Sequence, residues 1–165
     1  MNLDGVAVTI TKDLGEVVFV GAFAVITHVG TYRQTRDIDL AVASPISDNR
    51  LEELGYRVFQ EGRKRVIRTQ DGVKMDIYTD DVSGIAVPKI FETAITRRIG
   101  ADEIRVMGLE ALLIAKMRAS RDQDIEDLQQ LCRVKGRSIR WDVVESMAAQ
   151  LEVSNLRNTV RALSR

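Results

Sequence analysis

The feature that most constrains the fold is one short segment, Asp37-Ile-Asp-Leu-Ala-Val42, in which acidic or small residues alternate with apolar ones. Side chains of a β-strand point alternately to its two faces, so the pattern predicts a half-buried strand with Asp37 and Asp39 on the same face. Like charges on one face repel, and a bound cation would relieve that repulsion. The alternative is a solvated strand face that discourages edge pairing.

The segments around this strand predict strands first and helices last, which is the layout of a single α+β domain over residues 1–165. Strands are expected at 17–20, 37–42, 56–59, 65–69, 74–79 and 104–106. Helices are expected at 3–14, 22–29, 47–54, 109–118, 124–134, 141–151 and 154–163. Residues 80–100 predict only a helical turn at 88–93. The core then covers about 15–108, and a helical part covers about 109–165.

Composition excludes several classes of protein. The 24 Lys and Arg balance the 24 Asp and Glu, which argues against a dedicated nucleic-acid or membrane-surface binder. A local basic patch is compatible with this zero net charge. Cys132 is the only cysteine and His28 the only histidine, so neither an intrachain disulfide nor a thiolate metal site is expected. The N-terminus lacks a basic leader and no apolar run is long enough to span a membrane, so we expect a cytoplasmic protein.

A third carboxylate and a glycine extend the predicted site. Asp76 occupies the same face of its strand as Lys74 and Tyr78, and an exposed hairpin strand is the alternative reading. Mg²⁺ prefers such oxygen ligands. Gly21 falls at a strand-to-helix turn, where a missing Cβ and free helix N–H groups suit a phosphate. Together these residues predict metal-assisted phosphoryl or nucleotidyl transfer.

Two motifs resemble a known family. The first is Gly21-Ala-Phe-Ala24, followed after a helix by Arg33-Gln-Thr-Arg-Asp-Ile-Asp-Leu40. The second is Val106-Met-Gly-Leu-Glu-Ala-Leu-Leu-Ile-Ala-Lys116, followed by Arg121-Asp-Gln-Asp-Ile-Glu-Asp-Leu128. With Asp76 between them, they resemble the nucleotidyltransferase superfamily, especially its small abortive-infection (AbiEii-like) members. The resemblance spans about residues 17–131 and implies a mixed β-sheet with flanking helices.

The resemblance also implies roles for these residues. Asp37 and Asp39 would bind Mg²⁺ or Mn²⁺, and Asp76 would activate the acceptor hydroxyl or help to hold the metal.

The nucleotide-binding residues implied by the resemblance are Gly21 and Ala22 at the triphosphate, Arg33 and Thr35 beside it, and Lys116 at a phosphate or at the base-proximal part of the nucleotide. For Arg33 and Thr35, the alternative is a solvated loop. For Lys116, it is a side chain that reaches solvent from an amphipathic helix.

The implied activity is metal-dependent transfer of a nucleoside monophosphate from an NTP to an acceptor hydroxyl. The acceptor is RNA, a protein or a small molecule, and the resemblance suggests a toxin–antitoxin or defence system with a cognate partner protein. The alternative is a catalytically degenerate member that binds nucleotides or a partner. Ala22 favours this alternative, because the family commonly has Gly-Gly or Gly-Ser there and alanine offers no hydroxyl.

Overall fold

The structure is a computed structural model that describes residues 2–151. Its helices are α1 Leu3–Leu14, α2 Gly21–Val29, α3 Asp48–Glu53, α4 Val87–Thr93, α5 Leu109–Ala119, α6 Asp122–Lys135 and α7 Trp141–Gln150, with a 3-10 turn η1 at Gly136–Ser138. Its strands are β1 Val17–Val20, β2 Asp37–Val42, β3 Arg57–Glu61, β4 Lys64–Arg68, β5 Lys74–Tyr78, β6 Asp81–Val82, β7 Ile85–Ala86, β8 Ile95–Ile99 and β9 Asp102–Val106.

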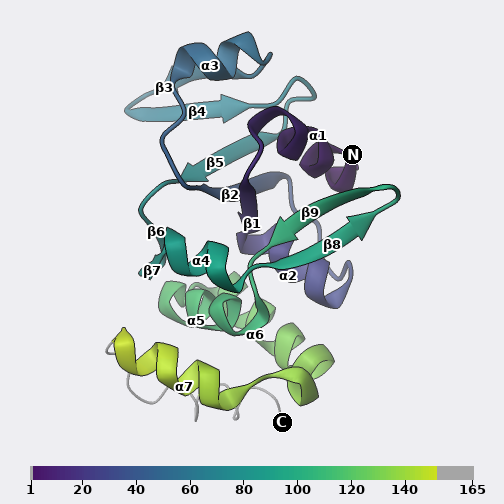
Figure 1. The fold of residues 1–165 in the computed structure, drawn as a ribbon, viewed down its shortest axis with the longest axis vertical. Helices are drawn as coiled ribbons and strands as arrows, with labels where there is room; N and C mark the ends of the chain where they lie inside the picture. Colours follow the sequence, from purple (N-terminus) through teal and green to yellow (C-terminus); the bar gives the residue numbers. More distant parts are fainter. Residues whose placement is uncertain (1, 152–165) are drawn as a thin grey trace.

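Seven of these strands form one mixed sheet in the order β3-β4-β5-β2-β1-β9-β8 (Figure 1). β2 runs parallel to β5 and β1 runs parallel to β9, whereas the other neighbours are antiparallel. β6 and β7 make a separate small hairpin. The predicted α+β class, with a mixed sheet and flanking helices, is therefore confirmed.

Each face of the sheet packs against its own hydrophobic cluster. On one face, Val18 and Val20 of β1 pack with the apolar sides of α2, α5, α6 and α7. On the other, Phe19 and Leu40 pack with Ile10 of α1. The period-two alternation of β1 and β2 therefore serves two cores at once. Figure 1 shows α4 to α7 gathered below the central strands, while β3, β4 and α3 extend away from them.

The sequence located most elements to within a few residues, but it missed the short β6–β7 hairpin and the edge strand β8. That strand reads Ile-Thr-Arg-Arg-Ile, lies at the sheet edge and is largely exposed, so no apolar alternation marks it. Its partner β9 was expected only from 104 to 106 and begins at Asp102. The helix expected at 154–163 lies outside the described residues.

Across residues 2–151, no helix combines the length and apolar character needed to cross a membrane.

Candidate active site

The three predicted carboxylates lie on neighbouring parallel strands and share one face of the sheet. Asp37 pairs with Lys74 and Asp39 pairs with Asp76 in the register of β2 and β5. Partners in a sheet present their side chains to the same face, so the register alone brings Asp39 and Asp76 side by side. Asp37 lies two residues before Asp39 on that face and is exposed, while Asp39 is partly buried.

Asp39 shows the electrostatic consequence of this arrangement. Burial raises the pKa of its carboxyl most, and the negative charges of Asp76 and Asp37 raise it further, to about 6. The positive charge of Lys116 opposes these effects without cancelling them. The protein thus holds an ionisable group where its charged form is disfavoured, which is common where a ligand later supplies the missing charge.

Gly21 forms the other wall of the site and must be a glycine for two reasons. Its φ is +63°, a conformation that residues with a Cβ rarely adopt. A Cβ built on Gly21 would lie 2.4 Å from Asp39 Oδ2, well inside contact distance. The backbone of the β1–α2 turn therefore runs directly against the carboxylate of β2.

The N-terminus of α2 opens at this turn. Gly21 is the first residue of the nine-residue helix, Val20 is its N-cap, and no side chain caps its free N–H groups. Such N–H groups and the positive end of the helix dipole bind anions. A cavity of about 70 Å³ adjoins the turn, and its lining includes Gly21, Asp39, Tyr78, Lys116 and Arg121. Ala22 follows in the first turn and contributes its backbone N–H but no hydroxyl.

The donor set fits a hard divalent cation. Within the described part of the chain, no three carboxylate, thiolate or imidazole groups converge closely enough to enclose a metal ion by themselves. Mg²⁺, however, is usually held by one or two carboxylates, with waters and substrate phosphates completing its shell. The closely placed Asp39 and Asp76 supply two carboxylates of that kind, and their repulsion is what a cation would relieve. Waters and the phosphates of a nucleotide would complete such a shell.

Lys116 occupies a different environment from the one predicted for a free phosphate ligand. Its ammonium Nζ lies 2.9 Å from Asp124 Oδ1 and 2.7 Å from Asp127 Oδ2, and all three side chains are buried. Lys116 also lines the small cavity beside Asp39. The alternative of a side chain reaching bulk solvent is therefore wrong, because buried carboxylates hold the ammonium in place.

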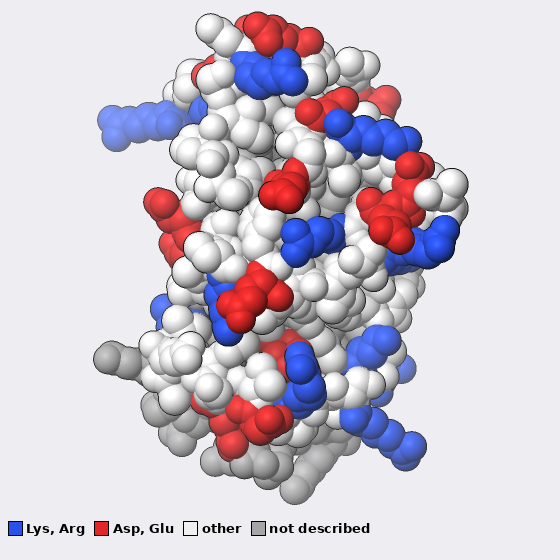
Figure 2. Space-filling model, in the orientation of Figure 1, with Lys and Arg blue, Asp and Glu red and all other residues white. Residues whose placement is uncertain are grey.

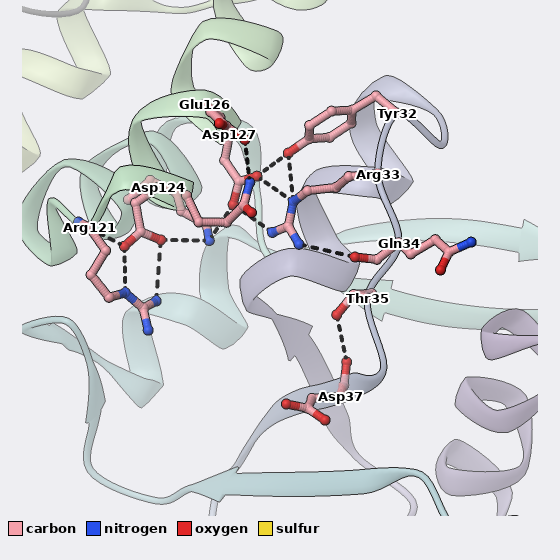
Figure 3. Close-up of polar contacts among 11 residues, drawn as sticks. Tyr32, Arg33, Gln34, Thr35, Asp37, Arg121, Asp124, Glu126 and Asp127 are labelled. Atoms are coloured by element: carbon pink, nitrogen blue, oxygen red, sulfur yellow. Dashed lines mark hydrogen bonds and ion pairs between the residues drawn. The ribbon is translucent and has the colours of Figure 1, made fainter.

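Asp127 connects the buried ammonium of Lys116 to the loop that leads into β2 (Figure 3). Arg33 donates from Nε to Asp127 Oδ1 at 2.9 Å and from Nη2 to Oδ2 at 3.0 Å, a bidentate pair. Tyr32 donates its hydroxyl to the same carboxylate. Burial alone would raise the pKa of Asp127, but the hydrogen bonds from Arg33 and Lys116 outweigh it and hold that pKa below its usual value.

Arg121 extends the cluster toward the small cavity. Its Nε donates to Asp124 Oδ2 at 2.7 Å, while its side chain is 77% exposed. Burial opposes ionisation of Asp124, yet the hydrogen bonds from Arg121 and Lys116 lower its pKa. Three cations therefore share two buried carboxylates, and the cluster formed by Arg33, Lys116, Arg121, Asp124 and Asp127 carries one net positive charge beside Asp39. That sign suits a phosphate chain.

Arg33 and Thr35 line a second, larger cavity of about 700 Å³, whose wall also includes Asp37. Thr35 Oγ1 donates to the backbone carbonyl of Asp37 at 3.3 Å, and Arg33 is bound to Asp127. Their predicted contacts with a nucleotide stay predictions. The two cavities flank the Asp37–Asp39 segment, the small one at Asp39 and the large one at Asp37.

Sequence reasoning missed Tyr78, Arg121, Asp124 and Asp127 as parts of the site. The second motif includes Arg121, Asp124 and Asp127, but the sequence predicts no role in the site for them, and it places Tyr78 on the carboxylate face without a role. A signal was present for Asp124 and Asp127. Lys116 is the one cation within the buried stretch of α5 from Leu109 to Met117, and such a charge requires a carboxylate partner.

The fold and the site together define a nucleotidyltransferase-type protein. The chain belongs to the family described as nucleotidyl transferase of unknown function (DUF2204), whose model matches residues 3–164. This confirms the expected superfamily, whereas the AbiEii-like subtype stays a prediction.

Solved structures agree at the level of the fold. An antigenic nucleotidyltransferase-like protein from Paracoccidioides brasiliensis superimposes with a TM-score of 0.60 at 14% identity, covering 97% of this chain and 92% of that one. The solution structure of the antibiotic-resistance factor ANT(2'')-Ia gives 0.59 at 16% identity, covering 99% and 96%. The crystal structure of ANT(2'')-Ia in complex with adenylyl-2''-tobramycin gives 0.50 at 17%, covering 97% and 95%. The comparison with curated proteins produced no match.

Proposed function

We propose that the protein transfers a nucleoside monophosphate from an NTP to an acceptor hydroxyl, with a divalent metal ion held at Asp37, Asp39 and Asp76. One observation carries the proposal: Asp39 and Asp76 stand in register on β2 and β5, and Asp39 directly contacts the Gly21 turn. Clustered carboxylates and a phosphate-binding helix end therefore lie within a few ångströms of each other. Phosphoryl transfer is the chemistry that uses both the carboxylates and the helix N-terminus.

The reaction places a separate demand on each group. The acceptor oxygen forms a bond to the α-phosphorus as the bond to the bridging oxygen of the β-phosphate breaks, and pyrophosphate leaves. Asp76 takes the proton of the attacking hydroxyl. The N–H groups of Gly21 and Ala22 bind the departing phosphates, and the positive charge of Lys116 and Arg121 offsets their growing negative charge. A divalent ion supplies charge neutralisation at the phosphates when bound.

The buried cluster positions these groups without touching the reacting atoms. Arg33 and Lys116 meet at Asp127, so the loop before β2 and helix α5 are fixed relative to each other. We infer that Lys116 acts on the nucleotide through its charge while its ammonium stays bound to Asp124 and Asp127. Precise placement of a site is worth orders of magnitude in rate, and rigid elements supply it best.

Calorimetric titration with each NTP, with and without Mg²⁺, tests the proposal. We expect binding that requires Mg²⁺ in the wild type and is lost in Asp39→Asn. Asp71→Asn, which removes an exposed carboxylate from the β4–β5 turn, should bind normally. If Asp39→Asn binds Mg·NTP as the wild type does, the metal assignment is wrong.

A degenerate protein that binds nucleotides or a partner is the second candidate. One observation favours it: Ala22 lacks the hydroxyl common in the family. Appearance of labelled nucleotide on any acceptor rules this candidate out. A stable complex with a co-purified protein, unaffected by Asp39→Asn, would support it. The toxin–antitoxin or defence setting, with its cognate partner, rests on the family resemblance.

A further inference from the structure

Three basic residues and Asp37 form one row across four adjacent strands. Arg57 of β3 pairs with Arg68 of β4, Arg68 pairs with Lys74 of β5, and Lys74 pairs with Asp37 of β2. Register partners share a face, so all four side chains belong to the face that carries Asp39 and Asp76. With neighbouring strands about 4.8 Å apart, the three basic residues span roughly 10 Å, and Asp37 lies one strand further on. We call these three cations the basic row.

The basic row is unfavourable for the isolated protein. Like charges directly opposite each other in a sheet destabilise it. The side chain of Arg57 has no hydrogen bond or ion pair with the residues that the structure describes, and among these residues the Arg68 side chain donates only to the carbonyl of Gly72, from Nη1 at 2.9 Å. Lys74 alone has a carboxylate partner, Asp76, at 3.3 Å between exposed groups. A bound anion would relieve this repulsion, as a cation would at Asp39.

The inner end of the row opens into the larger cavity. Arg68, Arg36 and Asp37 all line that space of about 700 Å³. Arg36 is exposed and, like Arg57, has no polar partner among residues 2–151. Asp4 adds one further carboxylate to the lining. The cavity therefore adjoins a predicted catalytic carboxylate and offers two guanidinium groups, of Arg36 and Arg68, that form no ion pair with a carboxylate of residues 2–151.

An exposed aromatic ring accompanies the row. Phe59 follows Arg57 by two residues on β3, so it occupies the same face, and it is 41% exposed. A ring beside a line of cations is the arrangement on which single-stranded nucleic acids stack their bases.

The outer end of the row is exposed, because Arg57 and Phe59 are both accessible to solvent. Arg65, which points to the opposite face of β4, pairs with Asp48 of α3, so α3 covers that other side. Figure 1 shows β3 and β4 extending beyond the layer formed by α4 to α7. Figure 2 shows acidic and basic side chains interspersed over the face in view, which agrees with the zero net charge. The row thus becomes evident from strand register and not from overall charge.

We propose that the basic row and Phe59 guide a single-stranded nucleic acid, whose terminal hydroxyl enters the larger cavity at Asp37 as the acceptor. This rests on the proposed function and names its acceptor class. Several phosphates in a chain are needed to match a row of this length, which a single small phosphate ester cannot do. The nucleotide then approaches from the small cavity at Asp39, so the two substrates meet from opposite sides.

Fluorescence anisotropy with a 5′-labelled, single-stranded RNA 12-mer of mixed sequence tests the proposal. Each phosphate contact contributes about −0.7 to the slope of log K against log salt for single strands, so three contacts predict a slope of about −2. Arg57→Gln should reduce that slope by about 0.7. Phe59→Ser should weaken binding at least about fivefold through lost stacking. Arg98→Gln, the same charge change at the opposite sheet edge, should leave both unchanged.

Three outcomes would overturn the proposal. The first is equal RNA affinity for Arg57→Gln and wild type. The second is competition by AMP as effective, per phosphate, as that of the unlabelled 12-mer, because this would indicate a site for one phosphate. The third is no RNA binding at all. If Mg·NTP still binds in that case, the proposed function stands and only the acceptor is wrong; loss of Mg·NTP binding would instead remove the proposed function.

Discussion

The backbone of Gly21 approaches Asp39 so closely that a single added carbon would lie 2.4 Å from Asp39 Oδ2. The turn proposed to bind phosphates and the strand proposed to bind metal are thus in direct contact, with no side chain between them. A nucleotide bound at the start of α2, as we propose, would therefore lie next to the carboxylates.

Replacing Gly21 with alanine should destabilise the fold and abolish nucleotide binding. The change adds both the strain of a positive φ and the clash with Asp39, each worth about 1–3 kcal/mol. Gly62→Ala is the matched control, because Gly62 has nearly the same φ of +64° with nothing within 4 Å of its added Cβ. Urea unfolding of both variants separates strain from clash. Equal losses of stability would mean that the contact with Asp39 is unimportant.

Replacing Asp39 with asparagine should stabilise the metal-free protein at neutral pH. Its pKa is about 6 in the folded state and about 4 when unfolded, so between these values the folded state binds more protons. The contribution of Asp39 to stability therefore falls as pH rises from about 4 to about 6 and stays low above that. Asp39→Asn removes this penalty of up to about 3 kcal/mol.

Thermal unfolding in EDTA from pH 4 to pH 8 measures the effect. The difference between Asp39→Asn and wild type should grow from about pH 4 to about pH 6 and then stay level, and Asp71→Asn should show no such trend. A variant less stable than wild type at pH 7 would contradict the proposed repulsion among Asp39, Asp76 and Asp37.

Replacing Asp127 with asparagine should destabilise the protein, whereas Asp39→Asn should stabilise it. The variant removes the buried carboxylate that pairs with Arg33 and Lys116. Breaking a buried ion pair lowers the free energy of unfolding by about 3–5 kcal/mol. The pKa of Asp127 is lowered by folding, so its contribution is present above about pH 4 and is lost as the pH falls through its folded pKa. The variant should therefore lose most relative stability at neutral pH.

Glu126→Gln provides the comparison, since Glu126 is the exposed neighbour on the same helix. Denaturant unfolding at pH 7 and pH 3 should separate the two variants at the higher pH far more than at the lower. Similar stability of both at pH 7 would show that the cluster is not a structural requirement.

Introducing serine at position 22 should strengthen nucleotide binding. Ala22 lies in the first turn of α2, where a hydroxyl would add a donor for the phosphates to the backbone N–H groups. A hydrogen bond to a charged group is worth about 1.5–3 kcal/mol, so we expect at least tenfold tighter Mg·NTP binding by calorimetry. Ala22→Cys, similar in size but a weak donor, should bind as the wild type does. An unchanged affinity in Ala22→Ser would indicate that phosphates do not bind at this turn.

The sequence predicted the carboxylate face of β2 because polar or small residues alternate with apolar ones along this strand. Such a pattern depends only on residues adjacent in the sequence. Asp76 was identified in the same way. The pairing of Lys116 with Asp127 depends instead on how two helices pack, and the meeting of Arg33 with Asp127 joins residues 94 positions apart. The basic row required the registers of four strands at once. Local pattern carries none of that information.

Asp127 also limits how this chain can be recombined. Arg33 belongs to the sheet part of the protein, whereas Lys116 and Asp127 belong to the helical part. Both cations nevertheless form ion pairs with the same buried carboxylate, that of Asp127. A chimera that joined residues 1–108 to the helices of a distant relative would combine cations and acids selected in different settings. The charges of the two parts would have to be matched in such a chimera. We therefore expect the sheet part and the helical part to be exchangeable only together.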